Sequence, residues 1–176
     1  MSDSEIGKRE LERDHLALFL KAYQTIASEN FELVDAETPD FIGRDNVGRS
    51  VGIELTQLRF SPSERSSRRL FPIGIVDHDA WWRLLGLLNA KEMTLTRGQW
   101  SRCERKILVV MLIDTSLDQL GWGFDTEEPT SEGFTEIWLA DHTQVDAFGA
   151  VDLLAVVHPT LAGRFATGDH GQKPFG

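Results

Sequence analysis

Apolar side chains recur at intervals of three and four residues along positions 5–28, and charged residues fill most of the positions between them. The apolar positions are Leu16, Phe19, Leu20, Tyr23 and Ile26. This period places the apolar side chains on one face of a helix and the charged ones on the other. We therefore predict an amphipathic helix over residues 5–28.

Short apolar segments separated by turn residues follow this helix. Residues 31–34 form one strand candidate. Residues 38–43 and 51–58 form two more, and they flank the turn-rich sequence RDNVGRS at 44–50. Two apolar runs joined by such residues are typical of a β-hairpin. We predict a hairpin over 38–58.

The middle of the chain is predicted to hold a loop and a second helix. Residues 60–75 contain Ser, Pro and Arg without periodicity, which predicts a surface loop. The helix runs through 80–93, with Asp77 or Asp79 as its N-cap, and ends before Gly98. Its apolar stripe consists of Trp81, Leu84, Leu85 and Leu88.

The second half of the chain supplies the remaining strands. Residues 106–114 form a continuous aliphatic run, which is typical of a central strand covered on both faces. Residues 134–141 and 151–159 are further strand candidates, and the Gly-rich tail 168–176 is predicted to fray. The order of elements predicts one α/β or α+β domain over residues 1–176, with a mixed central sheet flanked by helices.

The composition favours a globular protein without a membrane segment. The chain has 176 residues, of which 41% are hydrophobic and 26% charged. The longest aliphatic run, residues 107–113, is about a third as long as a membrane span, and the polar N-terminus lacks the apolar region of a signal peptide. We therefore expect a cytoplasmic protein that does not contact membranes. The single cysteine, Cys103, excludes an internal disulfide and is expected to be a small hydrophobe near a strand.

The charge is unevenly distributed along the chain. Its formal net value is −10, which opposes broad coating by nucleic acid. Residues 107–163 contain ten acids and no Lys or Arg, whereas four arginines stand against one glutamate between positions 59 and 69. Those arginines are Arg59, Arg65, Arg68 and Arg69. A polyanion would therefore have to bind the first half of the chain.

Several common catalytic motifs are missing from the sequence, among them the phosphate-binding loop, the serine-hydrolase elbow, the dinucleotide-binding glycines and the HExxH zinc motif. The histidines stand at positions 15, 78, 142, 158 and 170, and none forms a spaced ligand pair. We expect a surface or capping role for each histidine and no transition-metal cluster.

The predicted hairpin brings two carboxylates together. If its strands pair about Val47, Asp40 lies opposite Glu54 on the same face, with Cβ atoms about 5 Å apart. Two adjacent carboxylates repel each other unless a cation neutralises them, and Mg²⁺ prefers oxygen ligands of this kind. The alternative is that Asp40 merely begins a strand after Pro39 and that Glu54 faces solvent.

These residues resemble a known family. The sequence Pro39-Asp40-Phe41, followed by Gly-Ile-Glu-Leu-Thr at 52–56, is similar to the PD-(D/E)XK nuclease superfamily, in particular to small bacterial members with a PDF…GIExT pattern. The resemblance covers roughly residues 10–113. It implies a restriction-endonuclease-like core, and the predicted order of helix, strand, hairpin, helix and strand agrees with that core.

The resemblance also implies a metal site that holds Mg²⁺ or Mn²⁺. Asp40, Glu54 and the carbonyl of Leu55 would bind the metal, and an acid from the first helix would complete the site. Glu12 is a better candidate than Glu10, because it precedes Leu16 by four residues and therefore lies on the inward face of the helix.

The sequence departs from the family pattern at the catalytic lysine. Thr56 stands two residues after the acid, where the family has that lysine, and threonine carries no positive charge for the transition state. Some members take the lysine from the following helix, where this chain has Lys91. The alternative is that Lys91 is an ordinary surface residue.

Two functions follow as hypotheses. The first is a metal-dependent nuclease that hydrolyses phosphodiesters in DNA or RNA, with Asp40, Glu54 and Lys91 as catalytic residues and the four arginines between 59 and 69 gripping phosphates. The alternative is an inactive module on the same fold that binds a protein or a nucleic acid. For the adjacent tryptophans we expect Trp81 to be buried and Trp82 to be partly buried against another element or a second subunit of a homodimer.

Overall fold

The computed structural model describes residues 3–60, 77–95, 100–120, 129–143, 145 and 149–166. Their helices are α1 (Asp3–Ala27), α3 (His78–Glu92), α4 (Leu117–Leu120) and a 3₁₀ helix (Trp100–Arg102), and their strands are β1 (Phe31–Asp35), β2 (Phe41–Asp45), β3 (Ser50–Leu58), β4 (Arg105–Leu112), β5 (Glu136–Asp141), β6 (Asp152–Val157) and β7 (Gly163–Phe165). The predicted loop 60–75, apart from Phe60, and the tail 168–176 lie outside the described residues.

In the described part of the chain, seven strands form one mixed sheet in which they follow their order along the chain, β1 to β7. Strands β1, β2 and β3 are antiparallel, β3, β4 and β5 are parallel, and β6 and β7 return antiparallel. A parallel pair needs a crossover connection, and α3 lies between β3 and β4. The predicted α+β class with a mixed central sheet is confirmed.

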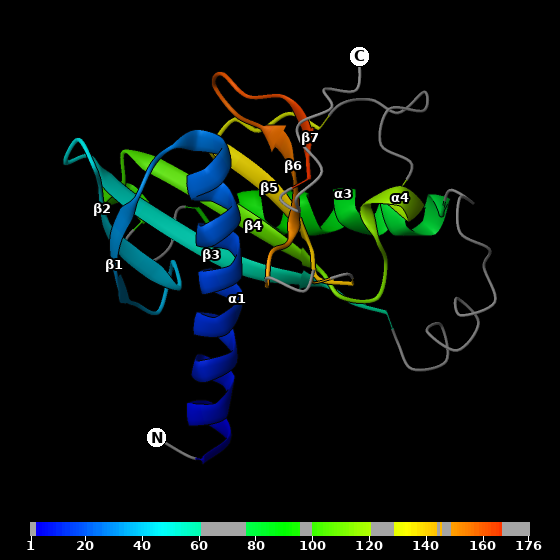
Figure 1. Cartoon of the computed structure of the whole chain (residues 1–176), viewed down its shortest axis with the longest axis horizontal. Helices are drawn as coiled ribbons and strands as arrows, with labels where there is room; N and C mark the ends of the chain where they lie inside the picture. The colour runs from blue at the N-terminus through cyan, green and yellow to red at the C-terminus, as the bar shows by residue number, and fades with distance from the viewer. Residues whose placement is uncertain are drawn as a thin grey trace.

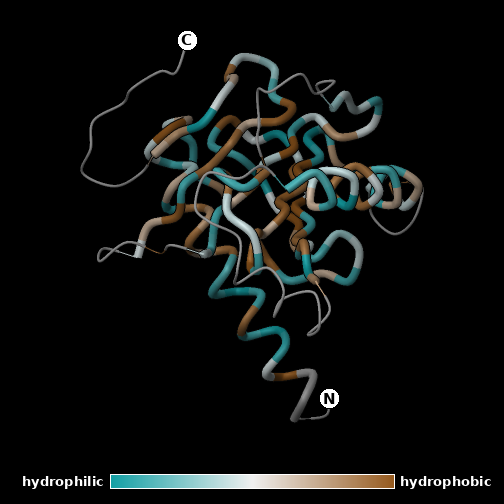
Figure 2. Tube along the Cα trace, turned by 90° about the vertical axis from the view of Figure 1, so that its right-hand side faces the viewer, coloured by the Kyte–Doolittle hydropathy of each residue, from teal (hydrophilic) through white to brown (hydrophobic). Residues whose placement is uncertain are grey.

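The two faces of the sheet carry separate hydrophobic cores, one under α1 and one under α3. Figure 1 shows α1 in front of the sheet and α3 behind it, with the first half of α1 extending past the strands. Figure 2 shows the apolar segments gathered in the interior. The core under α1 includes Leu16, Phe19, Ile53, Val109 and Trp138. The core under α3 includes Trp81, Leu84, Leu88, Leu108 and Val110.

The apolar run in β4 follows from this layering. Side chains along a strand alternate between faces, so Val109 enters the core under α1 and Leu108 enters the core under α3. Because helices cover both faces, neither set of side chains needs to be polar. The predicted central strand is therefore confirmed. Among the described residues, no helix is both long enough and apolar enough to cross a membrane.

The hairpin of β2 and β3 pairs about the predicted centre. Phe41 lies opposite Ile53 and Arg44 lies opposite Ser50, a register symmetric about Val47. Asp45 anchors the turn, because its Oδ1 accepts hydrogen bonds from the backbone N–H groups of Val47 at 3.1 Å and Arg49 at 2.9 Å. Strand β2 begins later than predicted, at Phe41, after Asp40.

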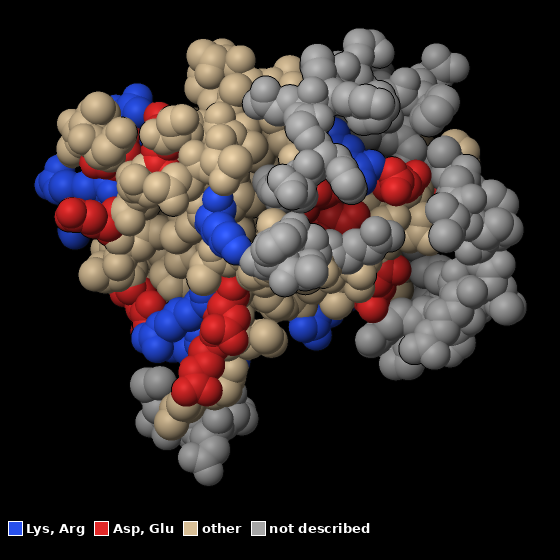
Figure 3. Space-filling model, in the orientation of Figure 1, with Lys and Arg blue, Asp and Glu red and all other residues tan. Residues whose placement is uncertain are grey.

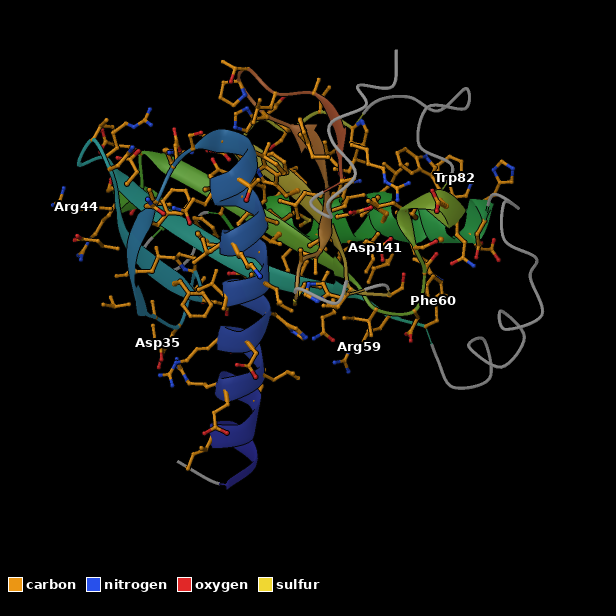
Figure 4. All side chains as sticks on the ribbon, in the orientation of Figure 1. Asp35, Arg44, Arg59, Phe60, Trp82 and Asp141 are labelled. Carbon is orange, nitrogen blue, oxygen red and sulfur yellow. The ribbon has the colours of Figure 1, made fainter. Side chains whose placement is uncertain are left out.

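The predicted N-cap and apolar stripe of α3 are confirmed. The predicted partial burial of Trp82 against another element of the chain is wrong, and its contact with a second subunit stays a prediction. Asp77 Oδ1 accepts a hydrogen bond from the backbone N–H of Ala80 at 3.1 Å, which caps the helix. Trp81 is buried at 5% exposure, whereas Trp82 is 69% exposed. Neighbouring side chains on a helix point about 100° apart, so burying Trp81 turns Trp82 outward (Figure 4).

Candidate metal and catalytic site

Asp40 extends the β2–β3 pairing through its side chain. The backbone register ends at Phe41 opposite Ile53, so Asp40 and Glu54 are the next residues on the two chains. The Oδ2 atom of Asp40 accepts a hydrogen bond from the backbone N–H of Leu55 at 2.8 Å. This bond holds the Asp40 carboxylate beside the middle of β3.

The backbone of Leu55 also offers an oxygen to this position. In an extended strand, the N–H and C=O groups of one residue point to the same side. The N–H of Leu55 points to Asp40, so its carbonyl points to that side too, beyond the last residue pair of β2 and β3. The Leu55 carbonyl and the Asp40 carboxylate therefore lie on the same side of β3.

Glu54 faces the α3 side of the sheet. Its neighbours Ile53 and Leu55 belong to the core under α1, so alternation along β3 turns Glu54 the other way. Its side chain is 13% exposed. The Oε2 atom is buried without a hydrogen-bond partner in the described structure, although an unpaired carboxylate oxygen is costly to bury. A bound cation would satisfy this oxygen.

Lys91 reaches Glu54 from α3. Its Nζ atom lies 2.6 Å from Glu54 Oε1, and its side chain is 23% exposed. Lys91 follows Leu88 by three residues and Leu84 by seven, so it continues the stripe that packs on the sheet. The alternative of an ordinary surface lysine does not describe this ion pair, which is partly buried.

The electrostatics of Asp40 reflect a surplus of negative charge. Burial raises the pKa of Asp40 to about 6, and the charges of Glu54 and Glu12 add to the rise. The hydrogen bond from Leu55 N–H and the charge of Lys91 oppose it but do not cancel it. Three carboxylates thus act on one region that holds one lysine, an arrangement that favours a divalent cation.

The first-helix acid that acts on Asp40 is Glu12. Its side chain is 22% exposed and forms an ion pair of 3.3 Å with Lys8. Glu10 is exposed and its charge acts on Arg13. In the described residues, no three His, Cys, Asp or Glu side chains are grouped closely enough to hold a metal. The donors at hand are the carboxylates of Asp40 and Glu54 and the Leu55 carbonyl, an all-oxygen set that fits Mg²⁺ or Mn²⁺ with water in the remaining positions.

Gly52 allows close packing beneath the site. A Cβ atom at this position would lie 2.8 Å from Pro39 Cγ and from Cys103 Sγ, and 3.0 Å from Trp100 Cζ3. Real Cβ atoms do not approach neighbours this closely, so the segment before Asp40 packs on β3 only because residue 52 is a glycine. Cys103 is half-buried directly before β4, as expected for a small hydrophobe near a strand.

The remaining predicted residues lie around this site or outside the described structure. Thr56 follows Glu54 by two residues on the same face of β3 and carries no charge. Arg59 is exposed just after β3, and its Nε donates a hydrogen bond to Gln57 Oε1 (Figure 4). Burial lowers the pKa of His15 on α1, and the charge of Arg59 adds to this effect. Arg65, Arg68 and Arg69 lie outside the described residues.

The histidines only partly follow the expected surface and capping roles. His158 has a capping role, because its Nδ1 accepts hydrogen bonds from the backbone N–H groups of Thr160 at 3.1 Å and Leu161 at 2.9 Å. His78 is exposed at the start of α3. His15 and His142 are half-buried, and their rings pack together with their centres 4.8 Å apart, a contact that was not predicted. The two histidines lie far apart in the chain, so no local sequence pattern predicted this contact.

A buried charged cluster under α1 was not predicted. Arg105, at 8% exposure, donates hydrogen bonds to Glu136, to Asp45 at 3.0 Å and to Glu29 at 2.6 Å. Tyr23 donates to Glu136 Oε2 at 3.0 Å. These hydrogen bonds pair the buried charges with one another, so we assign the cluster a role in stabilising the fold. Its signal in the sequence is an arginine at the start of an aliphatic strand.

Comparison with protein-family models, with curated proteins and with solved structures gave no match. The interpretation of the site therefore rests on the residues and their geometry.

Proposed function

We propose that this protein is a metal-dependent phosphodiesterase that cleaves DNA or RNA. The observation that carries the proposal is the convergence of Asp40, Glu54 and Lys91, with one buried Glu54 oxygen left without a partner. The PD-(D/E)XK resemblance, which implies the same three residues, supports the proposal independently of these contacts.

The chain's own residues would divide the work as follows. Asp40, Glu54 and the Leu55 carbonyl would hold the cation, which supplies charge neutralisation and an activated water when bound. Cation binding would compete with the ion pair between Lys91 and Glu54. Once freed, the Lys91 ammonium would remain beside the reacting phosphate and stabilise the charge that develops there, in place of a lysine at position 56.

The substrate would approach the site from the side of Arg59 and α1. Arg59 is exposed after β3, and Lys8 and Arg13 are exposed on the first half of α1. Figure 3 shows basic and acidic side chains intermixed along this part of α1. Phosphate contacts from such residues position a nucleic acid without reading its sequence.

The first test measures metal binding, because it requires no knowledge of the substrate. Mn²⁺ is titrated calorimetrically into the wild type, Asp40→Asn and the control Asp79→Asn, which removes an exposed acid from α3. We expect saturable binding in the wild type and the control, and its loss in Asp40→Asn. Equal weak uptake in all three proteins would reject the metal site.

The second test measures cleavage of labelled single-stranded and double-stranded DNA and RNA with Mg²⁺ or Mn²⁺. Removing a group that stabilises transition-state charge typically costs about 10²–10³ in rate, so we expect a loss of that size in Lys91→Ala. Asp40→Asn and Glu54→Gln should abolish cleavage. Cleavage that survives both carboxylate changes would overturn the proposal.

A specific observation favours a second candidate, an inactive module that binds a protein or nucleic acid. Lys91 already neutralises Glu54 at 2.6 Å, and Thr56 stands where the family has its lysine. An inactive module would bind its partner equally well as wild type and as Asp40→Ala, and neither protein would bind Mn²⁺.

A further inference from the structure

A pocket of about 250 Å³ opens on the part of the sheet formed by β1, β2 and β3, next to the start of β4. Its walls come from these three strands and from the 3₁₀ helix that precedes β4. The lining includes Val34, Ile42, Arg44, Ser50, Arg102 and Cys103. Apolar side chains and two arginines thus meet in one small concave surface.

The strand register places this pocket on the same face of the sheet as Glu54. Val34 lies opposite Ile42, and Ile42 lies opposite Gly52. Residues that oppose each other project to one face, and residues two apart on a strand share a face, so Gly52 and Glu54 lie on it together. At about 3.3 Å per residue, Ile42 lies roughly 7 Å along the chain from Asp40. The pocket therefore adjoins the candidate metal site.

The pocket is open because α3 does not extend over this end of the sheet. Among the described residues, the core under α3 draws on strands β3 to β6 and on none from β1 or β2. Figure 1 shows β1 and β2 beyond the end of α3. Val34 is 64% exposed as a result. The apolar side of the pocket is therefore accessible to a ligand.

Neither arginine of the pocket forms an ion pair with an acid in the described structure. Arg44 Nη1 donates a hydrogen bond to the carbonyl of Gly48 at 2.7 Å, and this acceptor is neutral. Arg102 is exposed, and within the described residues its side chain has neither a hydrogen bond nor an ion pair. A guanidinium group binds phosphate through two parallel N–H groups. The pocket is therefore complementary to an anion.

Two exposed acids stand near these arginines, and solvent screens their charge. Glu32 lies opposite Arg44 in the β1–β2 pair. Glu104 is held on Ser50, because its Oε2 accepts hydrogen bonds from the Ser50 backbone N–H at 2.9 Å and from Ser50 Oγ at 3.1 Å. Both arginines therefore stay available to a ligand.

An apolar wall next to guanidinium groups is suited to a nucleotide. Unpaired bases pack on the planes of arginine side chains, and phosphates accept paired hydrogen bonds from arginine. The pocket is slightly smaller than the range of about 300–1,000 Å³ that is typical for drug-sized ligands, so it has room for one base. A base in a continuous duplex is paired and stacked, and it does not reach such a pocket.

The pocket also lies on the path of a strand that passes the candidate metal site. Figure 4 shows Arg44 and Arg59 at opposite ends of β3. Arg44 lies opposite Ser50, four residues from Glu54, which places it roughly 13 Å from the metal site. This distance corresponds to about four nucleotides of a stacked strand at 3.4 Å each, and to fewer of an extended one. One strand can therefore contact Arg59, the metal site and the pocket.

We propose that this pocket binds one unpaired nucleotide of the substrate strand, with its base on Val34 and Ile42 and its phosphate on Arg44 and Arg102. The inference rests on the proposed nuclease function. It narrows the substrate to a single-stranded nucleic acid, or to a strand with an unpaired segment a few nucleotides from the cleaved bond.

The test is the binding of a short fluorescein-labelled oligothymidylate, measured by fluorescence anisotropy in EDTA so that no cleavage occurs. We expect Arg102→Met to bind about tenfold more weakly than the wild type, a loss typical of one hydrogen bond to a charged group. The slope of log affinity against log salt should fall by about 0.7, because one phosphate contact is lost. Arg102→Lys should retain the slope. The control Lys21→Met removes an exposed cation from α1, on the opposite face, and should bind like the wild type.

A second pair of variants tests the apolar wall at a position where the fold tolerates change. Val34 is exposed on an edge strand, so Val34→Asp and Val34→Ile should keep the circular dichroism of the wild type. Val34→Asp places a carboxylate beside the bound phosphate and should weaken binding about tenfold or more, whereas Val34→Ile should bind normally. A duplex of the same length should bind more weakly than the single strand. A duplex that binds as tightly, or pocket variants with unchanged affinity and salt slope, would overturn the proposal.

The same variants separate the pocket from the metal site. In EDTA, Asp40→Asn should bind the oligonucleotide at least as tightly as the wild type, because the change removes a negative charge. If the pocket variants bind normally while Asp40→Asn abolishes metal-dependent cleavage, the pocket is rejected and the nuclease function stands. If the pocket variants lose binding but the wild type cleaves nothing with Mg²⁺ or Mn²⁺, the pocket stands and the nuclease function fails. A wild type that binds no oligonucleotide rejects the pocket.

Discussion

At the scale of single residues, the charge of Asp40 destabilises the folded protein at a candidate functional position. Its carboxylate is held beside Glu54 and within the field of Glu12, and one backbone N–H and one lysine offset only part of the repulsion. For folding alone, an uncharged side chain at position 40 would be more favourable than a carboxylate. This conflict is typical of functional sites.

The first prediction is therefore that Asp40→Asn stabilises the protein at neutral pH. The pKa of Asp40 is about 6 in the folded state and 3.8 ordinarily, so its stabilising contribution is present below pH 4 and is lost as the pH rises through 6. Removing the charge should raise the free energy of unfolding at pH 7.5 by about 1–2 kcal/mol after solvent screening.

Urea unfolding at pH 7.5 and at pH 4 measures this effect, with Asp79→Asn as the control. The gain should be much smaller at pH 4, where the folded wild type protonates Asp40 and the unfolded chain, with a pKa of 3.8, does so in part. A destabilised Asp40→Asn at pH 7.5 would show that the Leu55 hydrogen bond outweighs the repulsion.

At the scale of elements, α3 links the fold to the candidate site. One stripe of the helix packs on the sheet through Leu84 and Leu88, and the same stripe ends in Lys91. The position of the lysine therefore depends on where the helix begins and on its packing. The N-cap at Asp77 sets where the helix begins.

The second prediction is that Asp77→Ala destabilises the protein by about 1 kcal/mol, because loss of an N-cap side chain leaves helix N–H groups unsatisfied. Asp79→Ala, in the first turn but not the capping residue, should cost less, since it removes only a favourable charge near the helix start. Chemical unfolding monitored by circular dichroism compares the two. Equal losses would indicate that the cap contributes nothing beyond charge.

At the scale of the whole molecule, the buried cluster around Arg105 connects segments that are distant in the chain. Arg105 of β4 binds Asp45 at the hairpin turn, Glu29 after α1 and Glu136 of β5. Burial would raise the pKa of Asp45, but hydrogen bonds from Arg105 and Arg49 outweigh it and hold the pKa at about 2.

The third prediction concerns this cluster. Arg105→Met leaves buried carboxylates without their cation and should cost about 3–5 kcal/mol at pH 7, whereas the exposed Arg102→Met should cost little. In the wild type, the stability that Asp45 contributes should be lost between about pH 4 and pH 2, because its folded pKa lies below the ordinary 3.8. Thermal unfolding as a function of pH measures the cost of Arg105→Met and the pH range over which the contribution of Asp45 is lost. If Arg105→Met hardly changed the free energy of unfolding, apolar packing would be able to replace the cluster.

Local periodicity was sufficient to determine most of the elements. The three- and four-residue spacing predicted α1 and α3, and the aliphatic run predicted the central strand β4, because the pattern of buried positions follows directly from element geometry. The turn residues centred on Val47 predicted the hairpin register, and with it the opposition of Asp40 and Glu54. The short elements β7 and α4 were not predicted, since three or four residues carry no detectable period.

Only the tertiary structure decided which residues meet across elements. The contacts of Lys91 with Glu54, of His15 with His142 and of Arg105 with its carboxylates join positions far apart in the chain. They depend on how the helices pack on the two faces of the sheet, which local patterns do not encode. The high exposure of Trp82 was not predicted, because the sequence shows the buried stripe of α3 but not whether another element covers the flank beside it.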